Sequence, residues 1–175
     1  MSPTPSKPVF RFRSVFISDI HLGFRGCSAD YLLDFLHSVE CDTLYLVGDI
    51  IDMWSLKRSF FWPQEHNNVI RTILGKAKAG TRVIYIPGNH DSVFREYCGM
   101  VFGNVEIHRE FVHENADGRT FLVLHGHEFA SVMAPNIWVD SIPGFRESAY
   151  GLFQAFDALG ARLLSAIARA AKLPP

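Results

Sequence analysis

The stretch Leu44–Asp52, which reads LYLVGDIID, holds the pattern that decides the fold. Four apolar residues in a row predict a buried strand, and Gly48 followed by Asp49 marks the point where the strand gives way to a loop. Three other apolar runs also end in polar residues of the types that bind metal ions. They are Val15–Ile17 before Ser18-Asp19-Ile20-His21, Val83–Ile86 before Pro87-Gly88-Asn89-His90-Asp91, and Phe121–Leu124 before His125-Gly126-His127.

Helical patterns separate these predicted strands. Between the first two strands, apolar residues recur at positions i, i+3, i+4 and i+7, namely Leu32, Phe35, Leu36 and Val39. Ser28 or Asp30 is a candidate for the start of this helix. A second helix is predicted to end near Gly80 and has on one face Ile70, Ile73, Leu74 and Ala77. Alternating strands and helices indicate a largely parallel, layered α/β domain, in which ligands bind beyond the carboxyl ends of the strands.

The rest of the chain gives fewer patterns. Val105–Ile107 is predicted as a further strand, and Asp117-Gly118 as the turn between it and the strand at 121–124. From Ala149 to Lys172 the apolar residues are close to helical spacing. We therefore divide the chain into a short disordered tail at 1–8, a core at 9–135 and a helical segment at 136–175.

The composition excludes several classes of protein. With 175 residues, of which 48% are hydrophobic and 13% aromatic, the chain can bury one core, which excludes global disorder. The 17 basic and 18 acidic residues give a net charge of −1, so a nucleic-acid partner is not expected. No run of about 18 apolar residues is present that would span a bilayer. The three cysteines lack a CxxC pattern, and we expect reduced thiols in a cytoplasmic protein.

Each polar cluster has an ordinary explanation when it is taken alone. Asp19 and His21 could be simple loop polarity, and Gly48-Asp49 a simple turn. Asn89 could cap the helix that follows it, and His125 could be a hydrogen-bonded core histidine. Together, at four predicted strand ends, these residues favour a metal site.

The residue types suit one kind of chemistry. Hydrolysis of a phosphate ester gains from two cations about 3.5–4 Å apart that hold the attacking and leaving oxygens. Asp49 is suited to bridge such a pair, because a shared carboxylate offsets the repulsion between two like charges. Mixed Asp, His and Asn ligands favour Mn²⁺, Fe or Zn²⁺ over Ca²⁺, which prefers oxygen ligands alone. We expect two divalent cations, Mn²⁺ first among them, with the ligands Asp19, His21, Asp49, Asn89 and His125.

Three neighbours of these residues are candidates for other roles. His90 follows Asn89 and could contact the phosphate or protonate the leaving oxygen, which makes it the candidate catalytic residue. Asp91 could orient His90 or cap the helix expected to start around Val93, and both alternatives stay open. Asp52 is expected to fix its loop by hydrogen bonds rather than to bind metal.

Four motifs of the sequence resemble those of the calcineurin-like metallophosphoesterase superfamily. They are Ser18-Asp19-Ile20-His21-Leu22-Gly23, Gly48-Asp49-Ile50-Ile51-Asp52, Gly88-Asn89-His90-Asp91 and His125-Gly126. The flanks Tyr45–Trp54 and Phe60–Gln64 are similar to the UDP-2,3-diacylglucosamine pyrophosphatase branch, which acts in lipid A synthesis. The resemblance covers about residues 14 to 165. It implies an α/β sandwich of two mixed β-sheets that pack face to face, flanked by helices.

The resemblance also implies roles for single residues. The matching ligands are Asp19 and His21 for one metal, Asn89 and His125 for the other, and Asp49 as the bridge. His90 would face the phosphate. The implied enzyme is a metal-dependent hydrolase of a phosphodiester or pyrophosphate, of the UDP-diacylglucosamine type first and of a nucleotide phosphodiester as an alternative. Its substrate would be a phosphorylated small molecule or a nucleotide-linked lipid.

Two departures from the superfamily pattern bear on activity. Members continue past a helical cap to a Gly-His-x-His motif that completes both metals, whereas this sequence stops at Pro175. We therefore expect the C-terminal strands to be missing and an exposed strand edge to favour self-association, with a non-catalytic remnant as the alternative. His127 stands where the branch usually has Asp. It could replace a lost ligand, since a strand through both residues would point His127 and His125 to one face, or it could be a surface or capping residue.

The segment Ala149–Lys172 resembles the start of the helical cap. The apolar surface of the region Phe145–Leu173 could hold acyl chains or touch the inner membrane peripherally, and ordinary core packing is the alternative.

Overall fold

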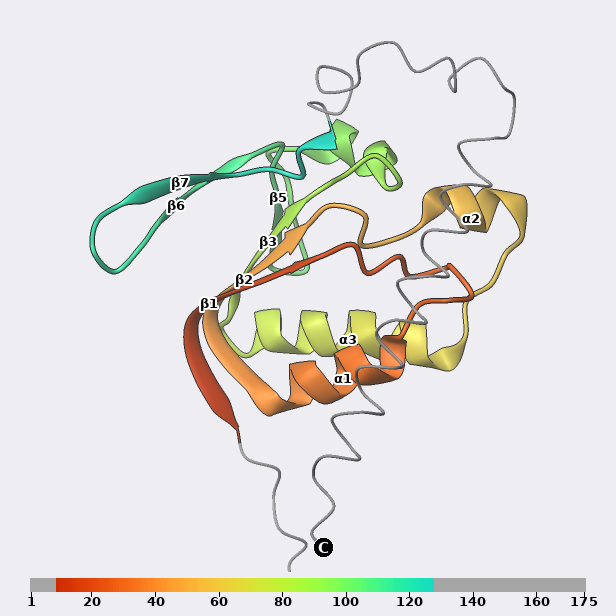
Figure 1. Ribbon diagram of the computed structural model, residues 1–175, viewed down its shortest axis with the longest axis horizontal. Coiled ribbons are helices and arrows are strands. Elements are labelled where there is room, and N and C mark those ends of the chain that lie inside the picture. Colours follow the sequence, from red (N-terminus) through yellow and green to blue (C-terminus); the bar gives the residue numbers. More distant parts are fainter. Residues whose placement is uncertain (1–8, 128–175) are drawn as a thin grey trace, which may run out of the picture. The chain divides into compact units, whose positions relative to one another are not determined.

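The computed structural model describes residues 9–127, which form a five-stranded sheet, a two-stranded sheet and the helices that flank them (Figure 1). The elements are β1 Phe10–Ser18, α1 Ala29–Ser38, β2 Val39–Val47, α2 Met53–Arg58, α3 Gln64–Lys78, β3 Arg82–Ile86, the 3₁₀ helix η1 Ser92–Tyr97, β4 Val101–Phe102, β5 Val105–Ile107, β6 Phe111–Glu114 and β7 Thr120–Val123. The predicted tail at 1–8, the end of the predicted core at 128–135 and the cap-like segment at 136–175 lie outside the described residues.

The larger sheet has the strand order β1-β2-β3-β5-β4. The first three strands and β5 run parallel, whereas β4 pairs with β5 in the antiparallel direction. The expected α/β class, with a mixed sheet flanked by helices, is confirmed. Because the parallel strands share one direction, the loops that follow β1, β2 and β3 meet at one edge of the sheet, where the predicted site residues lie.

The two faces of this sheet pack against different elements. On one face, α1 and α3 lie side by side (Figure 1), and their apolar residues join a core with inward residues of the strands, among them Leu44, Leu46 and Val83. On the other face, the core contains Tyr45, Ile84 and Ile86, with Phe111 and Val123 from the β6–β7 hairpin packed against them. This alternation follows from the two-residue period of strands. Each fully buried Leu, Val or Ile contributes about 1.5–3 kcal/mol to folding.

The structure corrects four details of the sequence prediction. Val39, expected on the first helix, begins β2, with an extended backbone of φ −124° and ψ 132° that suits its β-branched side chain. The Asp117-Gly118 turn joins β6 to β7, not the strand at 105–107 to the strand at 121–124. The strand β6 was not predicted, because its four residues are too few to display a clear period, and α2 was not predicted either.

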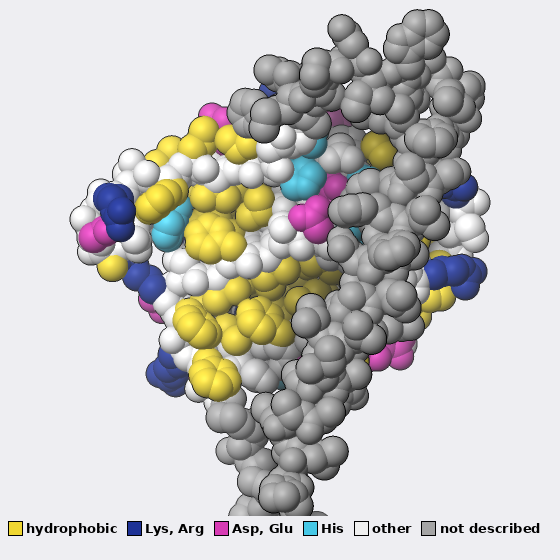
Figure 2. All heavy atoms as spheres, in the orientation of Figure 1, with side chains coloured by type: hydrophobic (Ala, Val, Ile, Leu, Met, Phe, Trp, Pro, Cys, Tyr) yellow, Lys and Arg dark blue, Asp and Glu magenta, His cyan; other side chains and the backbone are white. Residues whose placement is uncertain are grey.

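Hydrophobic side chains stay exposed on the edge strand β1. Figure 2 shows them gathered over this strand, and they include Phe10, Phe12 and Phe16, each about half exposed. An edge strand with apolar side chains is a template for association, so the predicted self-association stays a prediction with this surface in its favour.

Among residues 9–127, no helix has the length and hydropathy needed to cross a bilayer.

Candidate metal centre

Backbone hydrogen bonds tie the loops of the candidate site to one another. Asp19 N donates to Gly48 O at 3.1 Å, His21 N to Asp49 O at 2.9 Å, and Gly48 N to Ile86 O at 2.7 Å. The loops after β1, β2 and β3 are therefore held side by side by main-chain atoms, independently of the side chains that they present.

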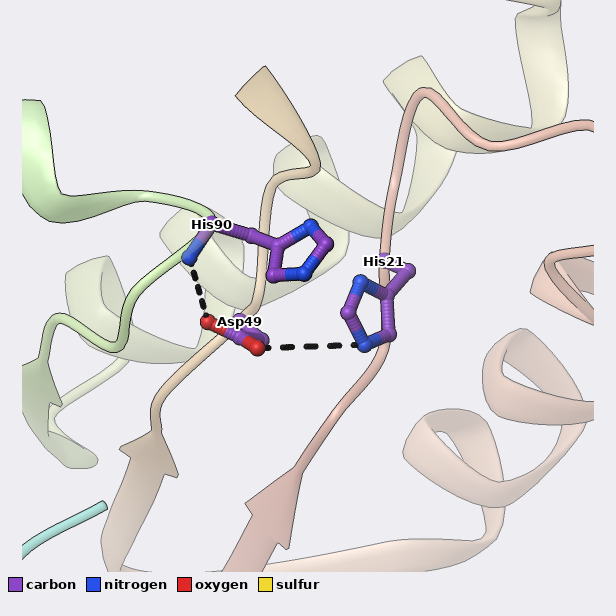
Figure 3. Close-up of side chains that lie close together, drawn as sticks. All are labelled: His21, Asp49 and His90. Atoms are coloured by element: carbon purple, nitrogen blue, oxygen red, sulfur yellow. Dashed lines mark hydrogen bonds and ion pairs between the residues drawn. The ribbon is translucent and has the colours of Figure 1, made fainter. Parts of the chain in front are cut away.

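Two groups of metal-ligating side chains lie at these loops. One consists of His21, Asp49 and His90, and the other of Asp19, Asp49 and His125; within each group the ligand atoms lie within 4.8 Å of one another. Asp49 belongs to both groups, and the dashed lines in Figure 3 mark its interactions with His21 and His90. Nitrogen and carboxylate donors in this number fit two divalent cations that share Asp49.

The grouping differs in part from the sequence expectation. Asp19 lies with His125, at 3.6 Å between Oδ1 and Nε2, whereas His21 was expected as its partner on one metal. Asp49 takes the central position expected of a bridge, 3.8 Å from His125 and 4.0 Å from His21. Asn89 is half-buried in the loop after β3, and its role as a ligand stays a prediction.

Three of the predicted ligands have a left-handed backbone. Asp19, His21 and Asp49 have φ values of 54°, 54° and 53°, and in the described chain Asn104 is the one further residue other than glycine with positive φ. Such conformations cost about 1–3 kcal/mol each and persist where the surrounding structure imposes them. Their concentration on the predicted ligands supports a functional site at these loops.

Two glycines make room for the ligands. A Cβ atom on Gly48 would collide with the imidazole of His125, and one on Gly88 would collide with the Asp49 carboxylate and lie 2.7 Å from His125 Nδ1. Gly48 also has a φ of 69°. The glycines of the Gly-Asp and Gly-Asn motifs are therefore required by the close packing of Asp49 and His125.

Asp52 fixes its loop by hydrogen bonds, as expected, and its carboxylate also contacts two histidines of the site. Its carboxylate caps α2 by accepting from Ser55 N at 2.8 Å and from Ser55 Oγ at 2.9 Å. The carboxylate also lies 3.0 Å from His90 Nδ1 and 3.5 Å from His21 Nδ1. Burial alone would raise the pKa of Asp52, but hydrogen bonds with His21, His90 and Ser55 outweigh it and hold that pKa well below its usual range. Asp52 is therefore an anion that can orient both imidazoles.

His90 lies deep in the site, with 3% of its surface exposed. Its backbone N donates to Asp49 Oδ1 at 2.9 Å, and its ring lies against Trp54 at a centroid distance of 4.0 Å. This position allows His90 to act on a substrate or to complete the group with His21 and Asp49. Its predicted catalytic role stays a prediction.

Asp91 does not fill the roles considered for it. It stands before η1 without a side-chain cap hydrogen bond, and the contact that orients His90 comes from Asp52. Instead, its carboxylate accepts from Gly88 N at 2.6 Å, Ile50 N at 2.8 Å and Tyr85 Oη at 2.5 Å. Asp91 thus joins strand β3 and the loops after β2 and β3.

His127 contacts His125 on the side away from the carboxylates. His125 faces Asp19 and Asp49 with Nε2, whereas its Nδ1 lies 3.1 Å from His127 Nδ1. Arg95 contacts the His127 ring in turn. The strand β7 ends at Val123, so the expectation that a strand would point both histidines to one face is wrong. As far as the described residues extend, neither ligand group includes His127.

The sequence analysis did not identify several residues that shape the site. Tyr85 and Trp54 are two of them, and His66 of α3 is a third, because its Nδ1 accepts from Gly23 N at 3.0 Å in the loop after β1. His66 is buried on the same helix face as Val69 and Ile73. That helical spacing was a signal that could have found His66, whereas no spacing rule connects Tyr85 to Asp91.

The chain is similar to a family of known proteins, to a curated protein and to a solved structure. The family model described as Calcineurin-like phosphoesterase matches residues 12–154. The DNA polymerase II small subunit of Methanothermobacter thermautotrophicus is 27% identical over 153 residues, which cover 67% of this chain and 31% of that protein. A crystal structure of Pseudomonas putida nuclease MPE is similar over 54% of this chain and 46% of its own, with a TM-score of 0.34 and 16% identity. The chain thus spans about a third of the curated relative that it matches.

The family match covers most of the chain and includes the four strand-end motifs from which the two ligand groups are built. The chain therefore belongs to the calcineurin-like phosphoesterase family.

Proposed function

We propose that this chain hydrolyses a phosphodiester or pyrophosphate bond with the help of two divalent cations, Mn²⁺ first and Fe or Zn²⁺ as alternatives. The observation that supports this function best is the place of Asp49 in both ligand groups. Two cations that hold the attacking and leaving oxygens of an in-line displacement lie close together, and a carboxylate shared by both ligand groups is suited to hold them there.

The side chains of the site have different roles in the proposed hydrolysis. When bound, the cations supply Lewis acidity and a nucleophile at neutral pH. Asp49 would offset the repulsion between them, and Asp19, His21 and His125 would complete their surroundings. Asp52, held as an anion, orients the Nδ1 side of His90, so that the other ring nitrogen can hold a proton for the leaving oxygen.

The first candidate substrate is UDP-2,3-diacylglucosamine or a similar pyrophosphate-linked lipid. The sequence flanks that resemble this branch contain exposed aromatic residues, and one of them lies against a residue of the site. Trp54 is 44% exposed while it lies against His90, and Phe60 is more exposed still. These rings offer apolar surface to an acyl chain or a face for a uracil ring to stack on.

A nucleic-acid phosphodiester is the second candidate. It is favoured by the similarity to a protein whose name is DNA polymerase II small subunit. The balanced charge of −1 opposes it, because nucleic-acid binding surfaces gain most of their affinity from basic residues.

The test compares substrates with one preparation. Purified protein with Mn²⁺ is assayed against UDP-2,3-diacylglucosamine, bis(p-nitrophenyl) phosphate and single- and double-stranded DNA, and Asp49→Asn serves as the inactive control. Selective cleavage of the lipid nucleotide supports the first candidate, and selective cleavage of DNA the second. A protein that binds metal but cleaves none of them contradicts the proposed activity and favours a non-catalytic member of the family.

We also propose a cytoplasmic location, with peripheral contact to the inner membrane if the substrate is a lipid. Its support is that Cys27, Cys41 and Cys98 are free thiols. Burial raises the pKa of Cys27 to about 12, which keeps that thiol protonated and unreactive.

A further inference from the structure

Asp91 is a fully buried carboxylate, 0% exposed, that accepts hydrogen bonds from five donors. Four of them are backbone amides, those of Gly88, Asp49, Ile50 and Ile51, and the fifth is the Tyr85 hydroxyl. A buried carboxylate is tolerated where hydrogen-bond donors satisfy its oxygens. Asp91 and its five donors therefore hold one another in place.

Three of the amides are consecutive and belong to the loop that carries Asp49. Oδ1 of Asp91 accepts from Asp49 N at 3.3 Å, and Oδ2 accepts from Ile50 N at 2.8 Å and Ile51 N at 3.4 Å. Consecutive amides that point at one anion form a concave nest. Asp49 has a φ of 53° here, a conformation that an aspartate keeps only where its surroundings hold it.

Tyr85 supplies the one side-chain donor among the five. It comes from β3, and its Oη lies 2.5 Å from Asp91 Oδ2. Tyr85 also lines an apolar cavity of about 470 Å³ together with Ile50 and Ile51. The hydrogen bond to Asp91 is itself buried, so water competes little with it. Burial and the Asp91 charge raise the pKa of Tyr85 well above its usual range, which keeps the hydroxyl protonated as a donor.

We propose that Tyr85 and Asp91 are positioning residues for the metal centre. Tyr85 fixes one oxygen of Asp91, and Asp91 holds the backbone of Asp49 in the left-handed conformation that places its carboxylate in both ligand groups. Neither residue touches a metal or a substrate in this arrangement. The proposal rests on the proposed function insofar as it presumes that Asp49 binds metal.

The test uses two tyrosines on neighbouring strands. Tyr85→Phe removes the hydroxyl at Asp91, and Tyr45→Phe removes the hydroxyl of another buried tyrosine, which lies 3.0 Å from His113 Nδ1 on the opposite face of the sheet. Mn²⁺ binding to each full-length protein is measured by calorimetry. We expect Tyr85→Phe to weaken Mn²⁺ binding by about 10- to 100-fold, as for partners that orient a ligand, and Tyr45→Phe to stay within about twofold of wild type.

A second measurement does not depend on metal. Amide hydrogen exchange at Asp49, Ile50 and Ile51 is expected to be slow in wild type and Tyr45→Phe, and at least about tenfold faster in Tyr85→Phe. Asp91→Asn, which turns an acceptor into a donor facing those amides, is expected to exceed Tyr85→Phe in both effects.

The outcomes separate the two proposals. Equal metal affinity in Tyr85→Phe and wild type, or equal losses in both tyrosine variants, would overturn the positioning role. If wild type binds no Mn²⁺, the proposed function fails, and the exchange rates alone decide: unchanged exchange in Tyr85→Phe overturns the positioning role, and faster exchange supports it.

Discussion

His125 Nε2 lies 3.6 Å from Asp19 Oδ1, and this carboxylate raises the pKa of the imidazole, with Asp49 adding to the effect and burial opposing it. The raised pKa means that metal-free His125 keeps its proton to a higher pH than an ordinary histidine. A metal ion must displace that proton, so we expect Mn²⁺ affinity to fall by up to about tenfold per pH unit below the raised pKa. Calorimetric titrations between pH 5.5 and 8.5 measure it, with His37→Ala, an exposed histidine on α1, as the control. Affinity that is constant over this range would contradict the prediction.

Asp49→Asn tests the shared carboxylate. Neutralising it leaves two cations without the anion between them, so we expect loss of most bound metal, more than about 100-fold in affinity, and of nearly all hydrolysis. Metal content is measured by elemental analysis after dialysis. Asp42→Asn, which changes an exposed carboxylate on β2, the strand that precedes Asp49, should retain wild-type metal. Normal metal content in folded Asp49→Asn protein would remove Asp49 from the ligand set.

His90→Ala separates a proton donor from a ligand. As a catalytic acid oriented by Asp52, its loss is expected to lower turnover by about 10²–10⁴-fold with metal content intact. Asp52→Asn should lower turnover in the same direction. Loss of metal together with activity in His90→Ala would instead make His90 a ligand beside His21 and Asp49.

Gly88→Ala tests the space around the ligands. The added Cβ would overlap the Asp49 carboxylate and come within 2.7 Å of His125, so we expect at least about tenfold weaker metal binding and an overpacking cost of about 1–3 kcal/mol. Gly75→Ala on α3 is the matched control, because a Cβ there meets nothing within 4 Å. That change should stabilise the helix by about 0.5–1 kcal/mol. Equal metal affinity in Gly88→Ala and Gly75→Ala would contradict this prediction, because it would show that the loop after β3 accommodates the added Cβ without weakening metal binding.

Glu106→Gln tests the Arg82–Glu106 pair of β3 and β5, in which Arg82 Nε and Nη2 donate at 2.7 and 2.9 Å. Arg82 lowers the pKa of Glu106 to about 2 from 4.5, with burial opposing and His108 assisting. A lowered pKa adds stability that is present above pH 4.5 and lost as the pH falls toward 2. Because Arg82 is half exposed, we expect a cost of only about 1 kcal/mol at pH 7, in urea unfolding of the metal-free protein. A cost that persists unchanged at pH 2 would contradict this assignment.

The convergence of the site could be predicted because parallel strands place their carboxyl ends at one edge. Three apolar runs, which form β1, β2 and β3, were enough to bring Asp19, His21 and Asp49 together. His125 follows β7, which belongs to the separate antiparallel hairpin, so this rule does not account for its position. The roles of Asp91 and His127 could not be predicted in the same way. Asp91 lies next to His90 in the sequence, yet its carboxylate turns toward amides more than 40 residues away, and only the folded loops show this.

The hairpin β6–β7 shows a second limit of sequence patterns. The strand Phe111–Glu114 alternates between half-buried and exposed residues, but over only four positions. Phe111 is recognised as a core residue only in the structure, where it packs against the buried Tyr45 and Ile84. The pairing of Asp19 with His125 was also beyond the sequence, because it depends on which way each left-handed residue turns its side chain.

The main-chain bonds from Asp19 to Gly48, from His21 to Asp49 and from Gly48 to Ile86 have a practical consequence. The ligands of each group come from at least two loops, so no excised peptide would keep a complete group. Release of bound Mn²⁺ to a chelating dye should therefore coincide with the cooperative melting of the sheet, not precede it. The colour change of the dye would then report the unfolding of β1, β2 and β3, and no fluorophore would have to be attached to the protein.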